Sequence, residues 1–192
     1  TARLLQHFSK ITALHWEEQR KLLKGVVVGP ILPKRRVEPQ NKGYILVSGG
    51  TFGHRLLFDT LAESQLHNLV VQTGAVDPSP YLKKHPEWRV LTVTDRFYEL
   101  IANAEIVVTH FGFTVLEALI YNKPVVLVPN PEWTRTAGMG DAEQLAKKIN
   151  AVLVSQIELG TILKAVQEAR KRQVPVFPDG AKNLARLILN SA

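Results

Sequence analysis

The stretch 107-VVTHFGFTVLEALIYNKPVVLVP-129 decides the predicted fold of this chain. An apolar run ends at Thr109, a turn forms at Gly112, a helical pattern covers 114–122, and a second apolar run follows. A strand, a helix and a second strand in this order form the unit that joins two parallel strands. Glu117 lies within the first turns of that helix. A carboxylate so close to the tip of a buried strand is either part of a helix cap or a ligand-binding group.

The same alternation extends from residue 43 to the end of the chain. Apolar runs predict strands at 44–48, 69–73, 89–93, 105–109, 124–128 and 151–154. Helical patterns lie at 54–63, 96–102, 114–122, 140–149, 157–172 and 180–190. The runs show little polar alternation, which is typical of parallel strands covered by helices on both faces. The sequence therefore predicts an α/β fold, a Rossmann-like doubly wound parallel sheet of about six strands.

Residues 1–42 show a different pattern. Two short strands, 11–15 and 26–30, with a helix near 17–24 between them, precede a proline-rich, charged segment. A pair of strands is marginal by itself and needs further strands or a helix. We therefore expect the two strands to be poorly packed, displaced or paired with another molecule. The chain starts at Thr1 without an initiator methionine, and we expect it to be part of a longer protein.

The composition limits the class of protein. Apolar residues make up 45% of the 192 residues, which is enough for a packed core. Cysteine is absent, which excludes disulfides and thiolate metal sites. No run approaches the ~20 apolar residues that span a bilayer, and residues 1–18 lack the pattern of a signal peptide. These features favour a cytoplasmic protein.

The net charge of +7 admits nucleic acid, anionic lipid or phosphorylated ligands as partners. The basic clusters 34-KRR-36 and 170-RKR-172 are not interleaved with aromatic residues, so we expect no nucleic-acid partner. Such clusters are most often plain solvated charge, and contact with an anionic membrane surface is the alternative.

Three loops follow predicted strands at the edge where a doubly wound sheet binds its ligands. In the first, 48-SGGTFGH-54, Gly49, Gly50 and Gly53 let the backbone approach a ligand at the start of a helix, where free N–H groups favour phosphate. The spacing is neither that of the dinucleotide fingerprint nor that of the Walker A loop. A plain tight turn is the alternative.

In the second loop, 109-THFGFT-114, Gly112 forms the turn and Thr114 is expected to cap the following helix. Glu117 follows Thr114 at the spacing of a capping box, which is the alternative to a role on a ligand. As a ligand-binding group, its two oxygens suit the two hydroxyl donors of a ribose. His54 and His110 lie in these two loops as candidate site residues, and a packed or surface position is the alternative.

The third loop, 129-PNPEWTRTAGMG-140, leads into another helix. Asp141 is expected to cap that helix or, together with Gln144 on its first turn, to bind sugar hydroxyls. The sequence contains no metal-binding spacing of the H-E-x-x-H kind and no G-x-S-x-G elbow. We therefore expect no metal site and no cofactor.

In this order, the three loops resemble the C-terminal, nucleotide-sugar-binding domain of GT-B glycosyltransferases of family 28. Residues 48–54 match the family's glycine loop, residues 103–129 its donor signature, and residues 141–149 its acidic-x-x-Gln stretch. The match covers roughly residues 25–190. The resemblance implies that the chain is one half of a GT-B fold.

The resemblance also implies roles for individual residues. Glu117 would hold the ribose of a UDP-sugar, while the diphosphate would lie over Thr114 and the glycine loop, which includes Thr51. The uracil would lie beside 95-DRF-97. The other implied contacts are Arg96, Phe97, His110, Gly112, Phe113, Asp141 and Gln144. The family usually has one more residue between Gly112 and Glu117, and its sugar loop is shorter than 130-NPEWTRTAG-138.

The implied function is that of the donor-binding part of an inverting, metal-independent glycosyltransferase. It would transfer GlcNAc or a related hexose from UDP to a lipid-linked or glycan acceptor, at the cytoplasmic face of a membrane. The alternatives are a non-catalytic nucleotide-sugar-binding subunit that needs a partner chain, and a UDP-sugar 2-epimerase.

Three parts of the chain follow from the same resemblance. Residues 1–30 would be the remnant of an N-terminal acceptor domain, 31–42 the interdomain linker, and 43–192 the nucleotide-sugar-binding domain. The catalytic base would lie in the missing acceptor domain, fused or as a partner subunit, so this chain alone would be inactive.

Overall fold

The computed structural model describes residues 2–132 and 138–190. The chain forms two compact units, one made of Thr1–Pro33 with Val176–Ala192 and the other of Lys34–Pro175. We name them unit 1 and unit 2 and describe each by itself. The sequence analysis extends the second domain to residue 192, whereas the structure groups its last residues with unit 1.

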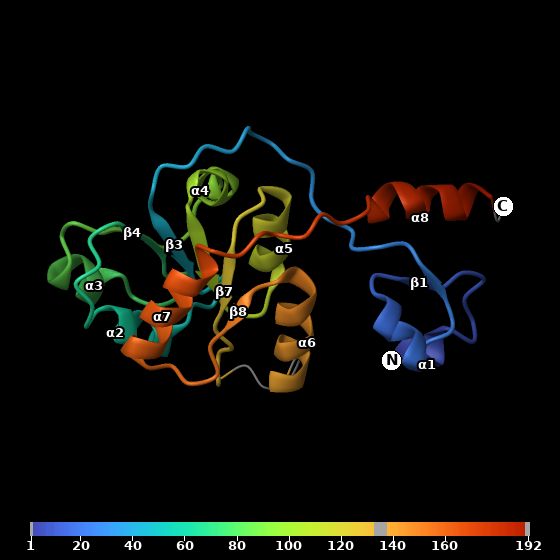
Figure 1. Ribbon diagram of the computed structural model, residues 1–192, viewed down its shortest axis with the longest axis horizontal. Coiled ribbons are helices and arrows are strands. Elements are labelled where there is room, and N and C mark those ends of the chain that lie inside the picture. Colours follow the sequence, from blue (N-terminus) through green and yellow to red (C-terminus); the bar gives the residue numbers. More distant parts are fainter. Residues whose placement is uncertain (1, 133–137, 191–192) are drawn as a thin grey trace. The chain divides into compact units, whose positions relative to one another are not determined.

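Unit 2 is built on a six-stranded parallel sheet with the order β5-β4-β3-β6-β7-β8 (Figure 1). Its strands are β3 (Ile45–Ser48), β4 (Leu69–Gln72), β5 (Arg89–Leu91), β6 (Ile106–Thr109), β7 (Val125–Leu127) and β8 (Val152–Leu153). The order reverses between β3 and β6, so the sheet is doubly wound. The predicted fold class is confirmed, and each strand lies inside its predicted apolar run.

Helices connect the strands of unit 2. They are α2 (Arg55–Leu61), α3 (Ser79–Lys84), α4 (Phe97–Asn103), α5 (Phe113–Ile120), α6 (Met139–Ile149) and α7 (Leu159–Ala169). The sequence analysis missed α3, because Pro78 and Pro80 at its start read as loop signals although proline is tolerated in the first turn of a helix.

Both faces of the sheet are covered. On one face, Ile45 and Val47 of β3 share a core cluster with Phe58 of α2 and Ile162 of α7. Leu46, between them, is fully buried and points to the opposite face. The helices α4 and α5, which pack against each other, bury their own apolar residues outside that cluster. Burial on both faces explains why the strands read as continuous apolar runs.

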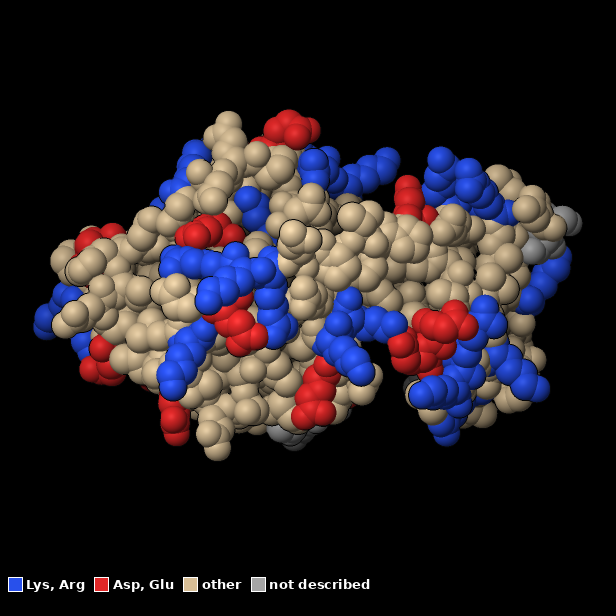
Figure 2. Space-filling model, in the orientation of Figure 1, with Lys and Arg blue, Asp and Glu red and all other residues tan. Residues whose placement is uncertain are grey.

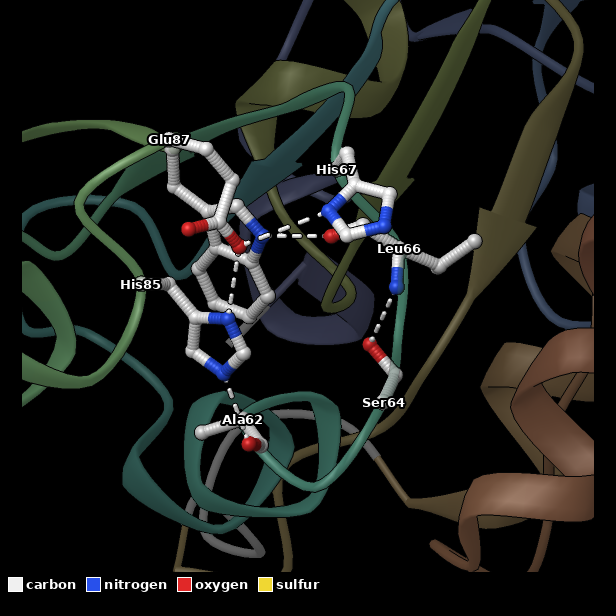
Figure 3. Close-up of polar contacts among 7 residues, drawn as sticks. Ala62, Ser64, Leu66, His67, His85 and Glu87 are labelled. Atoms are coloured by element: carbon white, nitrogen blue, oxygen red, sulfur yellow. Dashed lines mark hydrogen bonds and ion pairs between the residues drawn. The ribbon is translucent and has the colours of Figure 1, made fainter.

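A cluster of hydrogen bonds connects the end of α2 with the segment between α3 and β5 (Figure 3). The His85 ring bonds Ala62 O through Nε2 at 2.8 Å and the Glu87 carboxylate through Nδ1 at 2.9 Å. The same ring stacks on Trp88 with centroids 3.9 Å apart, and the Trp88 indole N–H donates to Leu66 O at 2.5 Å. These contacts satisfy buried polar groups at the end of the short helix α2.

Arginines of both basic clusters, 34–36 and 170–172, make hydrogen bonds or ion pairs within unit 2. Arg35 donates from Nε and Nη2 to Ile120 O, at 3.2 and 2.8 Å, which satisfies a free carbonyl at the end of α5. Arg170 pairs with Glu105 at 3.0 Å, and Arg172 pairs with Glu168. On the face drawn in Figure 2, Lys and Arg side chains are interspersed with Asp and Glu. Part of each cluster therefore has intramolecular partners.

Unit 1 contains α1 (Ala2–Leu5), β1 (Ala13–Leu14), a 3₁₀ helix (Glu17–Lys21), β2 (Val26–Val27) and α8 (Gly180–Leu189). The predicted helix near 17–24 is thus a short 3₁₀ helix. The strands β1 and β2 pair in parallel.

The expectation that these strands are poorly packed is wrong for their inner residues. Leu14 is 1% and Val28 3% exposed. Asn183 of α8 donates to Val28 O at 2.9 Å, and Trp16 meets Phe177 edge to face at 5.4 Å. The domain boundaries predicted from the sequence assign residues 176–190 to the other domain and so do not anticipate the contact of α8 with residues that follow β2.

Across residues 2–132 and 138–190, none of the helices is both long enough and apolar enough to cross a membrane.

Candidate functional site

A pocket of about 450 Å³ lies at the carboxyl ends of the strands of unit 2, where the strand order reverses. Such a switch point is where doubly wound sheets bind their ligands. The lining comes from the loops after β3, β5 and β6, from the end of β4, and from α4 and α5. It consists of Gly50, Thr51, Phe52, Gln72, Val93, Thr94, Phe97, His110, Phe111, Gly112, Phe113, Thr114 and Glu117. Two of the three predicted loops therefore meet in one pocket.

The three glycines of the loop after β3 have two different roles. Gly53 has φ +84°, and a Cβ there would collide with Thr73 O, while a Cβ at Gly49 would collide with the backbone N of His54. These two glycines shape the turn, and neither lines the pocket. Gly50, with φ +66°, does line it, and a Cβ there would lie 2.9 Å from the His110 Nε2. The turn thus explains Gly49 and Gly53. For Gly50, close approach of the backbone to a ligand stays a prediction.

Gln72 is a pocket residue that the sequence analysis did not identify. Its side chain, in a residue only 5% exposed, accepts from Ser48 Oγ at 2.7 Å and donates to Gly50 O at 3.2 Å and Thr92 O at 2.7 Å. It therefore joins the loops after β3 and β5. The one signal in the sequence is a polar residue at the end of the apolar run 69-LVVQT-73.

The two candidate histidines have different positions. His54 is fully buried at the start of α2, where its Nδ1 accepts from Leu57 N at 3.4 Å. Burial, with a smaller effect from His110 nearby, lowers the pKa of His54 to about 4. His110 lines the pocket, and burial lowers its pKa as well. At neutral pH both rings are mainly uncharged.

Glu117 faces the pocket from the second turn of α5. The helix starts at Phe113 with Gly112 as its N-cap, so the expectation that Thr114 caps it is wrong. Thr114, 8% exposed, is already the second helical residue. Glu117 is the fifth and does not occupy the capping-box position, because Gly112 replaces Thr114 as the cap. Burial raises the pKa of Glu117, and the positive charge of Arg36 opposes that rise.

The other predicted site residues lie apart from the pocket lining. The Asp141 carboxylate accepts from Gly138 N at 2.9 Å and so stabilises the start of α6, where Gln144 is exposed. Arg96 is exposed and pairs with Glu99 at 2.7 Å, although its neighbour Phe97 lines the pocket. Most of the loop 130–138, residues 133–137, lies outside the described residues.

Within the described ranges, no group of three or more His, Asp or Glu side chains is arranged to hold a metal ion.

Comparison with known families gives a match that covers most of unit 2 and extends into α8. Residues 44–186 match the glycosyltransferase family 28 C-terminal domain. The chain belongs to this family. The resemblance seen in the three loops is thereby confirmed.

Curated relatives of the chain share one name. The chain is 28% identical over 162 residues to the UDP-N-acetylglucosamine–N-acetylmuramyl-(pentapeptide) pyrophosphoryl-undecaprenol N-acetylglucosamine transferase of Flavobacterium psychrophilum, covering 79% of this chain and 44% of the relative. It is 29% identical over 175 residues to the protein of the same name in Salinibacter ruber, with 79% and 47% covered. The chain spans about half the length of these relatives.

Solved structures show the same fold. MurG of Acinetobacter baumannii superposes with a TM-score of 0.66 over 97% of this chain and 62% of that one, at 19% sequence identity. The calicheamicin glycosyltransferase CalG4 superposes with a TM-score of 0.56 over 85% of this chain and 43% of that one, at 24% identity. Both are GT-B glycosyltransferases, so the architecture predicted from the sequence is confirmed at the level of the fold.

Proposed function

We propose that this chain is the donor-binding part of an inverting glycosyltransferase that uses a UDP-sugar, with GlcNAc or a related hexose as the transferred group. Membership of family 28 and the name shared by the curated relatives support this proposal. The single observation that carries it is Glu117, a half-buried carboxylate that faces the switch-point pocket from α5.

The pocket has groups suited to both the nucleoside and the diphosphate of a nucleoside diphosphate. The carboxylate oxygens of Glu117 would accept from the two ribose hydroxyls. The diphosphate would lie over the start of α5, where free N–H groups and the helix dipole favour negative charge, and close to Gly50, whose lack of a side chain leaves room for it. Phe97, Phe111 and Val93 offer apolar surface for the nucleobase, the uracil of UDP.

In the proposed reaction, an acceptor oxygen attacks the anomeric carbon and the bond from that carbon to the β-phosphate oxygen breaks. UDP leaves with the bonding electrons, and the acceptor proton passes to a base. Residues at the pocket would stabilise the charge on the leaving diphosphate through fixed N–H groups, a preorganised electrostatic contribution. We assign the base to the part of the enzyme that this chain does not cover.

We further propose that the acceptor is lipid-linked and that the complete enzyme works at the cytoplasmic face of a membrane. The relatives' name, which specifies a pyrophosphoryl-undecaprenol, supports this acceptor class. An acceptor domain, fused to this chain or supplied as a partner subunit, would complete the site. Residues 1–30 would then be the end of that domain.

Calorimetry with the purified chain tests the donor. We expect UDP to bind with clear preference over ATP and NAD. Equal affinity for the three nucleotides would contradict the proposed donor class. A transfer assay with radiolabelled UDP-GlcNAc and a polyprenyl-pyrophosphate-linked acceptor should detect product only when the acceptor domain is present. Conversion of UDP-GlcNAc to its 2-epimer without acceptor would favour the epimerase instead.

A further inference from the structure

The side chain of Gln72, at the end of β4, belongs to a closed set of hydrogen bonds around Gly50. Gly50 N donates to Ser48 Oγ at 3.2 Å, and the Ser48 hydroxyl donates to Gln72 Oε1 at 2.7 Å. Gln72 Nε2 then donates to Gly50 O at 3.2 Å and to Thr92 O at 2.7 Å. Ser48 is fully buried and Gln72 is 5% exposed, so these bonds lie largely out of water, where each is stronger.

These bonds allow one orientation of the Gln72 amide. A backbone N–H can only donate, so Ser48 Oγ accepts from Gly50 and keeps its own proton for the Gln72 oxygen. Two carbonyls face the other end of the amide, which must therefore be the NH₂ group with its two donors. An ionised glutamate has nearly the same shape but no donor for either carbonyl. The network thus requires an amide rather than a carboxylate at this position.

Gln72 also holds the peptide that joins Gly50 to Thr51. Gly50 N is bonded to Ser48, and Thr51 O accepts from Ala75 N at 2.9 Å, so the backbone is anchored on both sides of this peptide. The carbonyl of the peptide itself accepts from Gln72. Gly50 has φ +66°, and glycine permits the backbone rotations that would turn such a peptide over. The hydrogen bond from Gln72 therefore selects one orientation of this peptide.

The selected orientation leaves a hydrogen-bond donor at the pocket. In a planar trans peptide the carbonyl and the following N–H point in opposite directions, so the Thr51 N–H points away from Gln72. Thr51 lines the pocket, and its N–H has no hydrogen-bond partner within residues 2–132 and 138–190. In the opposite orientation, the Gly50 carbonyl would take the place of this N–H and would repel an anion.

We propose that Gln72 is a positioning residue for the nucleotide donor, which holds the peptide between Gly50 and Thr51 so that the Thr51 N–H binds the diphosphate. The inference rests on the proposed function. Thr92 O also accepts from Gly74 N at 3.0 Å, so the loop after β5 keeps a bond to the end of β4 when Gln72 is replaced. A change at Gln72 should therefore weaken binding of the diphosphate and spare that of the nucleoside.

The first test needs no ligand. Crystal structures of the wild-type chain and of Gln72→Met, both free of nucleotide, should differ in the orientation of the peptide between Gly50 and Thr51. Methionine keeps the length of the side chain but has no donor for the Gly50 carbonyl. Gln65→Met, which replaces an exposed glutamine, is the matched control and should keep the wild-type orientation. The same single orientation in Gln72→Met as in the wild type would overturn the inference, whether or not the chain binds UDP.

The second test compares two ligands on the same variants. In calorimetry, Gln72→Met should weaken UDP binding about tenfold, the effect of losing one hydrogen bond to a charged group. The Kd of uridine, measured by NMR titration, should stay within about twofold of the wild-type value. Equal losses for UDP and uridine would mean a general structural defect and would refute the positioning role.

A second variant keeps this comparison decisive if Gln72→Met does not fold. Gln72→Glu retains an acceptor for Ser48 but offers no donor to the Gly50 carbonyl, and it should show the same selective loss of UDP binding. Failure of the wild-type chain to bind UDP would instead refute the proposed function, while the crystal structures would still decide the role of Gln72.

Discussion

His54 makes the stability of unit 2 sensitive to acid. Its ring is fully buried, with Nδ1 accepting from Leu57 N, and burial lowers its pKa from the ordinary 6.5 to about 4. Between these two values the unfolded chain binds a proton that the folded chain does not. The free energy of unfolding therefore falls as the pH drops through this window. Each pKa unit corresponds to 1.36 kcal/mol, so the full contribution is about 3 kcal/mol, present above pH 6.5 and lost by pH 4.

The assay is urea denaturation at half-unit steps from pH 7.5 to pH 4, with the wild-type chain and His54→Asn. Asparagine keeps a good N-cap for α2 and removes the titrating ring. The difference in unfolding free energy between the two proteins should change by about 3 kcal/mol between pH 6.5 and pH 4, in the direction that favours the variant in acid. His67→Asn, which removes an exposed histidine, is the control. Parallel pH profiles for wild type and His54→Asn would show that the buried ring is not the acid-sensitive group.

Three further outcomes concern the pocket and the glycine loop beside it. Glu117→Gln should lose about 1.5–3 kcal/mol of UDP binding, roughly tenfold to a hundredfold in Kd, with little change in melting temperature; a fall in melting temperature at constant Kd would mean a structural role instead. UDP binding should be equal with and without EDTA, since we propose no metal at the diphosphate, and strict magnesium dependence in calorimetry would contradict this. Gly53→Ala should lower the free energy of unfolding, measured by urea denaturation, by more than ~1 kcal/mol, because a Cβ collides with Thr73 O at φ +84°, whereas Gly160→Ala, with open space around its Cβ, should not.

The sheet could be predicted from the sequence because its inner strands, β3, β4, β6 and β7, are buried on both faces. Runs such as 44–48 and 105–109 have the length of a strand and are bounded by helical patterns, and the observed strands Ile45–Ser48 and Ile106–Thr109 lie within them. The helix Ser79–Lys84 was not predictable in the same way, since its two prolines and its single turn and a half leave almost no periodic pattern. Local sequence alone also did not indicate that α8 packs with the first strands, because that contact joins the two ends of the chain.

The part of the site that follows from the order of the strands could be predicted. The loops after β3 and β6 meet because these strands are neighbours in the sheet, which the switch-point rule anticipates. Thr114 is not the cap because the extended residue before the helix is Gly112, two residues earlier than capping preferences suggest. Gln72 could not be found, since its role depends on hydrogen bonds to Gly50 and Thr92 across the sheet.

The proposed ligand combines two groups with opposite electrostatic needs, and α5 offers both along its length. Its first turn, which starts at Phe113, presents free N–H groups that favour a diphosphate, whereas Glu117 needs hydrogen-bond donors and repels anions. Four residues separate them, and at 1.5 Å per residue this is about 6 Å along the helix axis, roughly the step from a phosphate to a ribose. The neutral rings of His54 and His110 add no charge at the phosphate end. A ligand with a ribose but no phosphate would gain only the second half of this arrangement, which is why we expect uridine to bind this chain much more weakly than UDP.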